Sequence, residues 1–225
     1  SNTDKLSEFF EELKRLEIRV QRPCINECFA DFVPKQNTLF YALGAIKNVG
    51  YEAISQLIEE REKNGKFKSI SDFITRVNPK NINKLQLEGL VKAGTFDSIF
   101  ENRKVLYNNI PNIIQNSKTI HENKLKNQSS LFSGENQKIS YLLQDKNITN
   151  WLNDEALSKE FESVGFYISD HPLNDYQDLL KQYKVKSFKD FENASDNESF
   201  IAGTVMSIKE KKTSKGNAFA IIKFS

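Results

Sequence analysis

The sequence is poor in residues that bind metals or form disulfides. Cys24 and Cys28 are its only cysteines, and His121 and His171 are its only histidines. Two cysteines cannot form a disulfide framework, which favours a reducing, cytoplasmic location. Structural zinc sites use closely spaced ligand pairs, whereas the two histidines lie far apart in the sequence. We therefore expect neither a disulfide scaffold nor a metal site.

Long apolar runs and a strong charge imbalance are also missing. No stretch approaches the roughly 18 apolar residues that a membrane span requires, and no signal peptide is recognisable. Lys and Arg number 32 against 30 Asp and Glu, which gives a net charge of +2. Without a basic field over the whole chain, any nucleic-acid site must be local. The first residue is Ser1 and the last, Ser225, falls in an apparent strand, so we expect a fragment of a longer protein.

The spacing of apolar residues predicts a mainly α protein with a short β segment at its end. A short extended segment is expected at 38–43, and an antiparallel hairpin at 199–209 and 218–224 encloses a basic turn. Residues 118–140 are rich in Asn, Gln, Lys and Ser, which predicts a flexible linker. Helices are predicted at 6–16, 51–63, 69–77, 83–93, 102–114, 153–164 and 175–183.

Two short segments share one pattern, in which an apolar residue, two spacers and a second apolar residue precede a glycine. The segments are 46–50 and 90–94. The pattern is typical of a helix-hairpin-helix motif, in which a tight turn presents backbone N–H groups to a DNA phosphate at the start of a helix. The alternative for either segment alone is an ordinary helix junction ended by a glycine. The expected DNA contacts are Lys47, Asn48, Val49, Gly50, Tyr51, Lys92, Ala93, Gly94 and Thr95.

One position departs from the usual motif. Asn48 stands where a second glycine is common, but Asn adopts left-handed backbone geometry more readily than most residues, so we expect the turn to form.

The stretch Leu43–Gly50 resembles a signature of the alpha subunit of bacterial DNA polymerase III. Segments 65–73, 87–97 and 165–173 resemble further parts of that family in the same order. Arg22 and Cys24 depart from the family pattern, which weakens the inference for their loop. The resemblance implies the end of a fingers region at 1–37, a tandem helix-hairpin-helix domain at 38–117, a linker with a clamp-binding motif at 118–140, a small helical region at 141–195 and the first strands of a truncated OB-fold at 196–225.

The resemblance also assigns roles to two further sets of residues. Gln128, Leu131 and Phe132 resemble the peptide that binds the sliding clamp; alternatively, the apolar pair packs on a neighbouring surface. A basic OB-fold loop can contact single-stranded DNA, and the alternative is a solvated turn. Its candidate residues are Lys209, Lys211, Lys212 and Lys215.

These observations predict a DNA-binding and clamp-binding part of a replicative polymerase. The partners implied are duplex DNA, the sliding clamp, single-stranded DNA and other polymerase III subunits, with no membrane. In the family, nucleotidyl transfer uses palm carboxylates with magnesium, and no matching acidic motif occurs here. We therefore expect no catalytic residue and no cofactor in this chain. The alternatives are a helix-hairpin-helix repair protein, which would need an acidic or Lys-based active site beside the hairpin, and a helical protein-interaction scaffold without DNA affinity.

Overall fold

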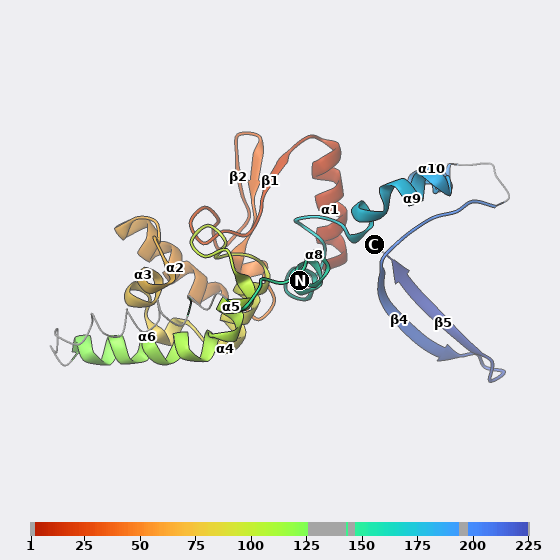
Figure 1. The fold of residues 1–225 in the computed structure, drawn as a ribbon. Coiled ribbons are helices and arrows are strands. Elements are labelled where there is room, and N and C mark those ends of the chain that lie inside the picture. The colour runs from red at the N-terminus through yellow and green to blue at the C-terminus, as the bar shows by residue number, and fades with distance from the viewer. Residues whose placement is uncertain (1–2, 126–142, 144–146, 194–197, 225) are drawn as a thin grey trace. The chain divides into compact units, whose positions relative to one another are not determined.

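The computed structural model describes residues 3–125, 143, 147–193 and 198–224 and separates the chain into two compact units. The first unit comprises residues 1–169 and the second comprises residues 170–225. The fold is mainly α, as the apolar spacing predicts (Figure 1). Along the described part of the chain, no helix combines the length and apolar character needed to cross a bilayer.

The first unit begins with a helix and a small three-stranded sheet. Helix α1 (Thr3–Arg15) precedes β1 (Arg19–Gln21), β2 (Val33–Lys35) and β3 (Thr38–Phe40). Strand β3 lies in the middle, parallel to β1 and antiparallel to β2. The boundary expected after residue 37 therefore falls inside a sheet, because strands on both sides of it hydrogen-bond to one another.

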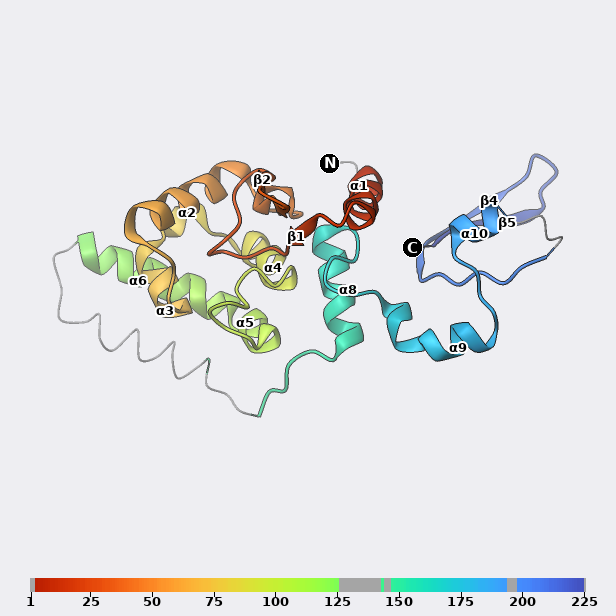
Figure 2. The same cartoon turned by 90° about the horizontal axis from the view of Figure 1, so that it is seen from above.

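The helices of the first unit surround α4, which packs against α5, α6 and α8 (Figure 2). Short 3-10 turns precede α2 and α4. The elements are η1 (Leu43–Ala45), α2 (Tyr51–Asn64), α3 (Ile70–Arg76), η2 (Pro79–Asn81), α4 (Lys84–Lys92), α5 (Arg103–Asn108), α6 (Ile110–Leu125) and α8 (Asn153–Val164).

Side-chain caps fix where two of these helices begin. At α3, the Ser69 hydroxyl accepts a hydrogen bond from the Asp72 N–H at 3.1 Å. At α4, the Asn83 side chain accepts from the Gln86 N–H, and the Gln86 side chain accepts from the Asn83 N–H, each at 2.9 Å. This reciprocal capping box satisfies two N–H groups that the helix itself cannot bond. The predicted starts of both helices are confirmed.

Two polar side chains, the buried Arg61 and the half-buried Asn26, tie the 22–30 loop to the helices. Arg61 of α2 is buried, and its Nη1 donates to the carbonyl oxygens of Ile25 at 2.9 Å and Cys28 at 2.6 Å. The Asn26 side chain donates to the Phe67 carbonyl and accepts from the Phe67 N–H, both at 2.8 Å. The backbone groups of this irregular loop thus find partners inside the protein, as buried backbone must.

Helix α6 corrects the expected start of the linker at residue 118. It continues to Leu125, and residues Ile113, Ser117 and Ile120 are buried along one face. The Lys124 side chain donates to the Thr75 carbonyl at 2.5 Å. One apolar or small residue per turn is enough to pack this face, so the polar composition that predicted a linker belongs to the exposed side. The single helix expected at 102–114 is in fact α5 followed by the start of α6.

The second unit contains short helices and a β-hairpin. These elements are η4 (Pro172–Tyr176), α9 (Gln177–Gln182), α10 (Phe188–Glu192), β4 (Val205–Lys212) and β5 (Ala218–Phe224). The hairpin is antiparallel as predicted, but β4 extends to Lys212, further than expected. The helical region expected at 141–195 is divided, because α8 packs on α4 within the first unit whereas α9 and α10 belong to the second.

The structure predicts that the 118–125 segment contributes to stability. We expect Ile120→Ala to lower the free energy of unfolding by about 2–4 kcal/mol, because it removes a fully buried side chain. Urea denaturation measures this difference. The control Lys118→Ala changes an exposed residue of the same helix and should have little effect. Equal stability of the two variants would mean that residues 118–125 do not pack in the fold and belong to the linker.

Candidate nucleic-acid interface

The turn at residues 46–50 leads directly into α2. Ile46 and Val49 are buried and anchor it, whereas Lys47, Asn48 and Gly50 are exposed. Asn48 adopts a left-handed φ of 64°, which confirms that Asn can replace glycine at this position. The turn is closed by the Val49 N–H, which donates to the Ile46 carbonyl at 3.1 Å.

Several N–H groups at this turn have no acceptor in the part of the chain that the structure describes. Within the described residues, the N–H groups of Asn48, Gly50, Tyr51 and Glu52 donate no hydrogen bond, and Gly50, the N-cap of α2, provides no side-chain cap. Helix α2 has 14 residues, so its N-terminus carries the partial positive charge of a substantial helix. Exposed donors at such an end form an arrangement that suits an anion.

Helix α4 lies directly against this turn. A Cβ at Gly89 would lie 2.7 Å from the Lys47 carbonyl oxygen, so glycine in the middle of α4 permits the close approach of the two backbones. At Gly50 the backbone has an ordinary φ of −77°. Glycine is therefore not needed there for its backbone conformation, and its effect is to leave space beside the turn. The Gln86 Nε2 lies 3.4 Å from the position that a Cβ of residue 50 would take.

The second expected hairpin, at residues 90–94, has a different geometry. The N–H groups of Ala93, Gly94 and Thr95 each donate to a carbonyl of α4 at 3.0 Å, and Ala93 and Thr95 are buried. Gly94 has a left-handed φ of 73° and packs against the Arg103 guanidinium. This is a helix C-terminus with its N–H groups already bonded, as the alternative of an ordinary helix end describes. It therefore offers no free backbone donors to a phosphate.

The two lysines expected at the interface have different surroundings. The Lys92 Nζ lies 2.7 Å from the Glu162 carboxylate, with the Tyr107 ring 5.6 Å away. Burial disfavours the charged form of Lys92, but the hydrogen bond to Glu162 outweighs it and the pKa of Lys92 is raised. Lys47 is exposed and forms no ion pair within the described part of the chain. Only Lys47 is free to meet a ligand.

The side chain of Tyr51, the first residue of α2, is hydrogen-bonded to a residue of the loop between β1 and β2. Its hydroxyl donates to the Asp31 carboxylate at 2.9 Å, and that hydrogen bond raises the pKa of Tyr51. Its side chain is therefore occupied, whereas its backbone N–H remains available at the helix end.

A turn that the sequence pattern did not identify lies between α3 and α4, at residues 77–83. The Asn78 side chain accepts from the Lys80 N–H at 3.0 Å, and Asn81 donates to Gln56 of α2. Lys80 and Lys84 are exposed. The Asn78-Pro79 pair and the capping box of α4 were the available signals for a second helix-turn-helix unit here, since both mark a turn that opens a helix.

The remaining predicted site residues lie elsewhere. Gln128, Leu131 and Phe132 fall outside the described residues. In the second unit, Lys209 and Lys211 share one face of β4 and pair with Ile221 and Phe219 of β5. The strand alternation places Lys212 on the opposite face. Lys215 lies in the turn between the two strands. The structure thus brings together two of the four lysines and sets them beside an aromatic ring.

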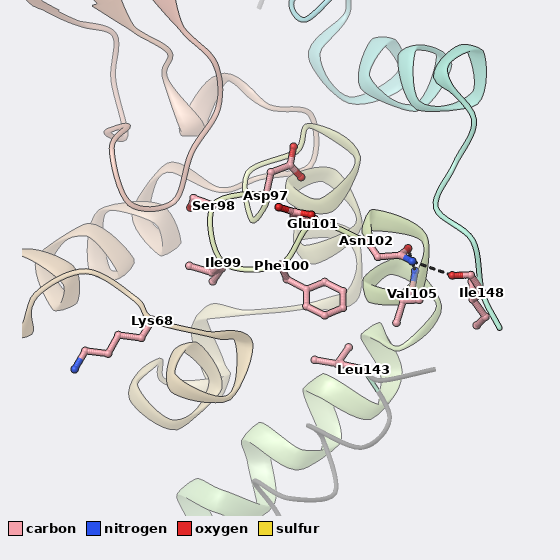
Figure 3. Close-up of a pocket in the computed structure, with 10 residues that line it drawn as sticks. All are labelled: Lys68, Asp97, Ser98, Ile99, Phe100, Glu101, Asn102, Val105, Leu143 and Ile148. Atoms are coloured by element: carbon pink, nitrogen blue, oxygen red, sulfur yellow. Dashed lines mark hydrogen bonds between the residues drawn. The ribbon is translucent and has the colours of Figure 1, made fainter. Parts of the chain in front are cut away.

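A pocket of about 720 Å³ lies beside the loop that follows α4 (Figure 3). Phe100, Val105 and Leu143 give it an apolar part, and Asn102 donates to the Ile148 carbonyl at 2.9 Å at its edge. Of its two acidic residues, Asp97 and Glu101, Asp97 is paired with Arg103. Across the described residues, no three His, Cys, Asp or Glu side chains form a group that could hold a metal ion. We assign no chemistry to this pocket.

Comparison with known proteins finds one match to the hairpin motif and others along nearly the whole chain. A profile described as a helix-hairpin-helix motif matches residues 17–106. DNA polymerase III subunit alpha of Borreliella burgdorferi is 37% identical over 221 residues, which is 97% of this chain and 19% of that protein. The Caulobacter vibrioides subunit is 32% identical over 228 residues, which is 100% of this chain and 20% of that protein. The chain thus spans about a fifth of these relatives, and the resemblance found in its motifs is confirmed.

The contrast between the two lysines leads to a stability test. We expect Lys92→Gln to lower the free energy of unfolding by about 1 kcal/mol or less, because half-exposed ion pairs contribute little, and Lys47→Gln to leave it unchanged. The hydrogen bond from Lys92 lowers the pKa of Glu162. The contribution of the pair is therefore present above the ordinary Glu pKa of about 4.3 and is lost as the pH falls below it. Urea unfolding at neutral and acidic pH measures both effects; a pH-independent difference would contradict the assignment.

Proposed function

We propose that this chain, which is homologous along nearly its whole length to one segment of DNA polymerase III alpha subunits, is a duplex-DNA-binding region of such a polymerase. The observation that carries the proposal is the set of exposed, unbonded N–H groups at the 46–50 turn and the start of α2, inside a matched helix-hairpin-helix motif. The alternatives of a repair protein and of an interaction scaffold are less well supported, because the relatives reported above are polymerase subunits.

The proposed contact is made by the backbone. The free N–H groups of Gly50 and Tyr51 would donate to one phosphate oxygen or two, with the positive end of α2 behind them. Lys47 adds a mobile cation, and Glu52 in the same turn is held along the helix by the Gln56 side chain at 3.2 Å. Because phosphates carry no base identity, binding should not depend on sequence. Because the net charge is only +2, the whole chain does not attract DNA strongly, and binding must depend on these local contacts.

The 77–83 turn is the second contact that we propose, in place of residues 90–94. It precedes α4, whose Lys84 and Leu85 N–H groups donate no hydrogen bond within the described residues. Lys80 supplies positive charge there, and Lys84 adds to it although its Nζ lies 3.8 Å from the Glu88 carboxylate. Two turns that open neighbouring helices would hold two phosphates, which gives a firmer grip on a duplex than one turn could.

For the longer polymerase we propose template-directed DNA synthesis, with magnesium and the catalytic carboxylates supplied outside this chain. Other polymerase III subunits would be its partners. We further propose that the β4–β5 hairpin contacts single-stranded DNA. The supporting observation is the pairing of Lys211 with Phe219, because a base can stack on an aromatic ring while a lysine meets its phosphate.

We also propose that the segment around Gln128 binds the sliding clamp. Leu131 and Phe132 would insert into an apolar pocket of the clamp, and burial of each contributes about 1.5–3 kcal/mol. Ordering the peptide on the clamp would offset part of this gain. Micromolar affinity needs about 8 kcal/mol, so the peptide alone should bind weakly. Simultaneous DNA binding by the same chain would raise the effective concentration of a clamp threaded on that DNA.

A salt series tests the DNA contact. The 225-residue chain should bind labelled duplexes of unrelated sequence with similar affinity, and the affinity should fall steeply with salt because phosphate contacts release counterions. Lys47→Gln should weaken binding to every duplex and reduce the slope of log K against log salt by about 1. Lys92→Gln is the matched control, since that lysine is already paired. An unchanged slope for Lys47→Gln would remove this lysine from the interface, and no binding by the wild type would refute the proposed function.

A double substitution tests the clamp contact. Replacing Leu131 and Phe132 with Ala should abolish binding to the clamp in a pull-down or titration, while DNA affinity and the melting temperature stay nearly unchanged. A fall of several degrees in the melting temperature would mean that the pair packs within this chain. Normal clamp binding by the double variant would place the contact elsewhere and remove the role of Gln128 as well.

A further inference from the structure

The side chain of Gln86 on α4 is oriented by the cap of its own helix. Its Oε1 accepts a hydrogen bond from the Asn83 N–H at 2.9 Å, which holds one end of the side-chain amide. The other end of that amide, Nε2, consequently faces the 46–50 turn and lies 3.4 Å from where a Cβ of Gly50 would be. Within the described residues, Nε2 donates no hydrogen bond.

This amide therefore adds N–H donors beside the free backbone N–H groups of Gly50 and Tyr51. The two sets of donors come from different helices, α2 and α4, whose relative position is fixed where Gly89 meets the Lys47 carbonyl. We propose that Gln86 donates a hydrogen bond to the same DNA phosphate that the turn holds. The inference rests on the proposed DNA contact and adds a side-chain ligand to it.

The chemistry of the cap explains why the amide matters. Either Gln or Glu can close a capping box, because only an acceptor oxygen is needed for the backbone N–H. Glu would place a negative charge against Gly50, where a phosphate is expected, whereas Gln keeps a neutral donor there. A Cβ at position 50 would lie in van der Waals contact with this amide, so a side chain larger than Ala would compete with Gln86 and with the phosphate for the same space.

The substitution Gln86→Glu separates the two roles of this residue. The cap and the melting temperature should be retained, while duplex affinity should fall about tenfold or more, because a carboxylate replaces a donor beside a phosphate. Gln115→Glu makes the same charge change at an exposed position of α6 and is the control. Fluorescence anisotropy at fixed salt measures both. Equal affinity of Q86E and Q115E would overturn the inference.

A substitution of opposite charge distinguishes a direct effect on DNA binding from a loss of affinity caused by unfolding. Gln86→Lys sacrifices the cap but adds a cation, so it should bind duplex DNA about threefold more tightly than Gln115→Lys. A gain of this kind cannot result from unfolding. If the wild type binds DNA and Lys47→Gln weakens it, but neither Gln86 variant differs from its Gln115 counterpart, the role of Gln86 is refuted and the proposed function stands. If the wild type does not bind DNA, both fail.

Discussion

The close approach of α4 to the 46–50 turn is the constraint on which the rest of the site depends. It requires that Gly89 have no side chain, since a Cβ there would collide with the Lys47 carbonyl. On its other side the turn is held by the Lys47 N–H, which donates to the Ser163 carbonyl at 2.9 Å. Lys47 is thus packed against α4 on one side and hydrogen-bonded to α8 on the other, and the neighbouring donors of Asn48 and Gly50 lie on exposed residues. A preorganised set of donors loses less entropy on binding than a mobile loop would.

The two segments that share one sequence pattern differ in whether their backbone N–H groups are already hydrogen-bonded. At 46–50 the glycine precedes a helix, so the N–H groups around it belong to a helix start and remain unbonded. At 90–94 the glycine follows a helix, so the nearby N–H groups are bonded to carbonyls of that helix. A helix N-terminus attracts anions and a C-terminus repels them, so the two segments present opposite electrostatic surroundings to an anion.

Much of the fold could be predicted from the sequence, but less of the site. Apolar spacing and capping residues such as Ser69 identified the helices, and the tolerance of Asn48 for left-handed geometry was foreseen correctly. The pattern at 90–94 misled because a helix-ending glycine and a hairpin glycine look alike without the direction of the adjoining helix. The end of α6 was missed because Ile120 is the single large apolar residue of its turn. The role of Gln86 was not visible in sequence, since it depends on contact between helices far apart in the chain.

The central claim is that the donors of the 46–50 turn and the first turn of α2 bind DNA through their N–H groups. Amide chemical shifts of the ¹⁵N-labelled chain, followed during titration with a short duplex, test it most directly. The signals of Asn48, Gly50, Tyr51 and Glu52 should shift with a common saturation curve, while those of Ala93 and Thr95 stay in place. Shifts confined to residues 93–95 or to the β4–β5 hairpin, with the turn unaffected, would contradict it.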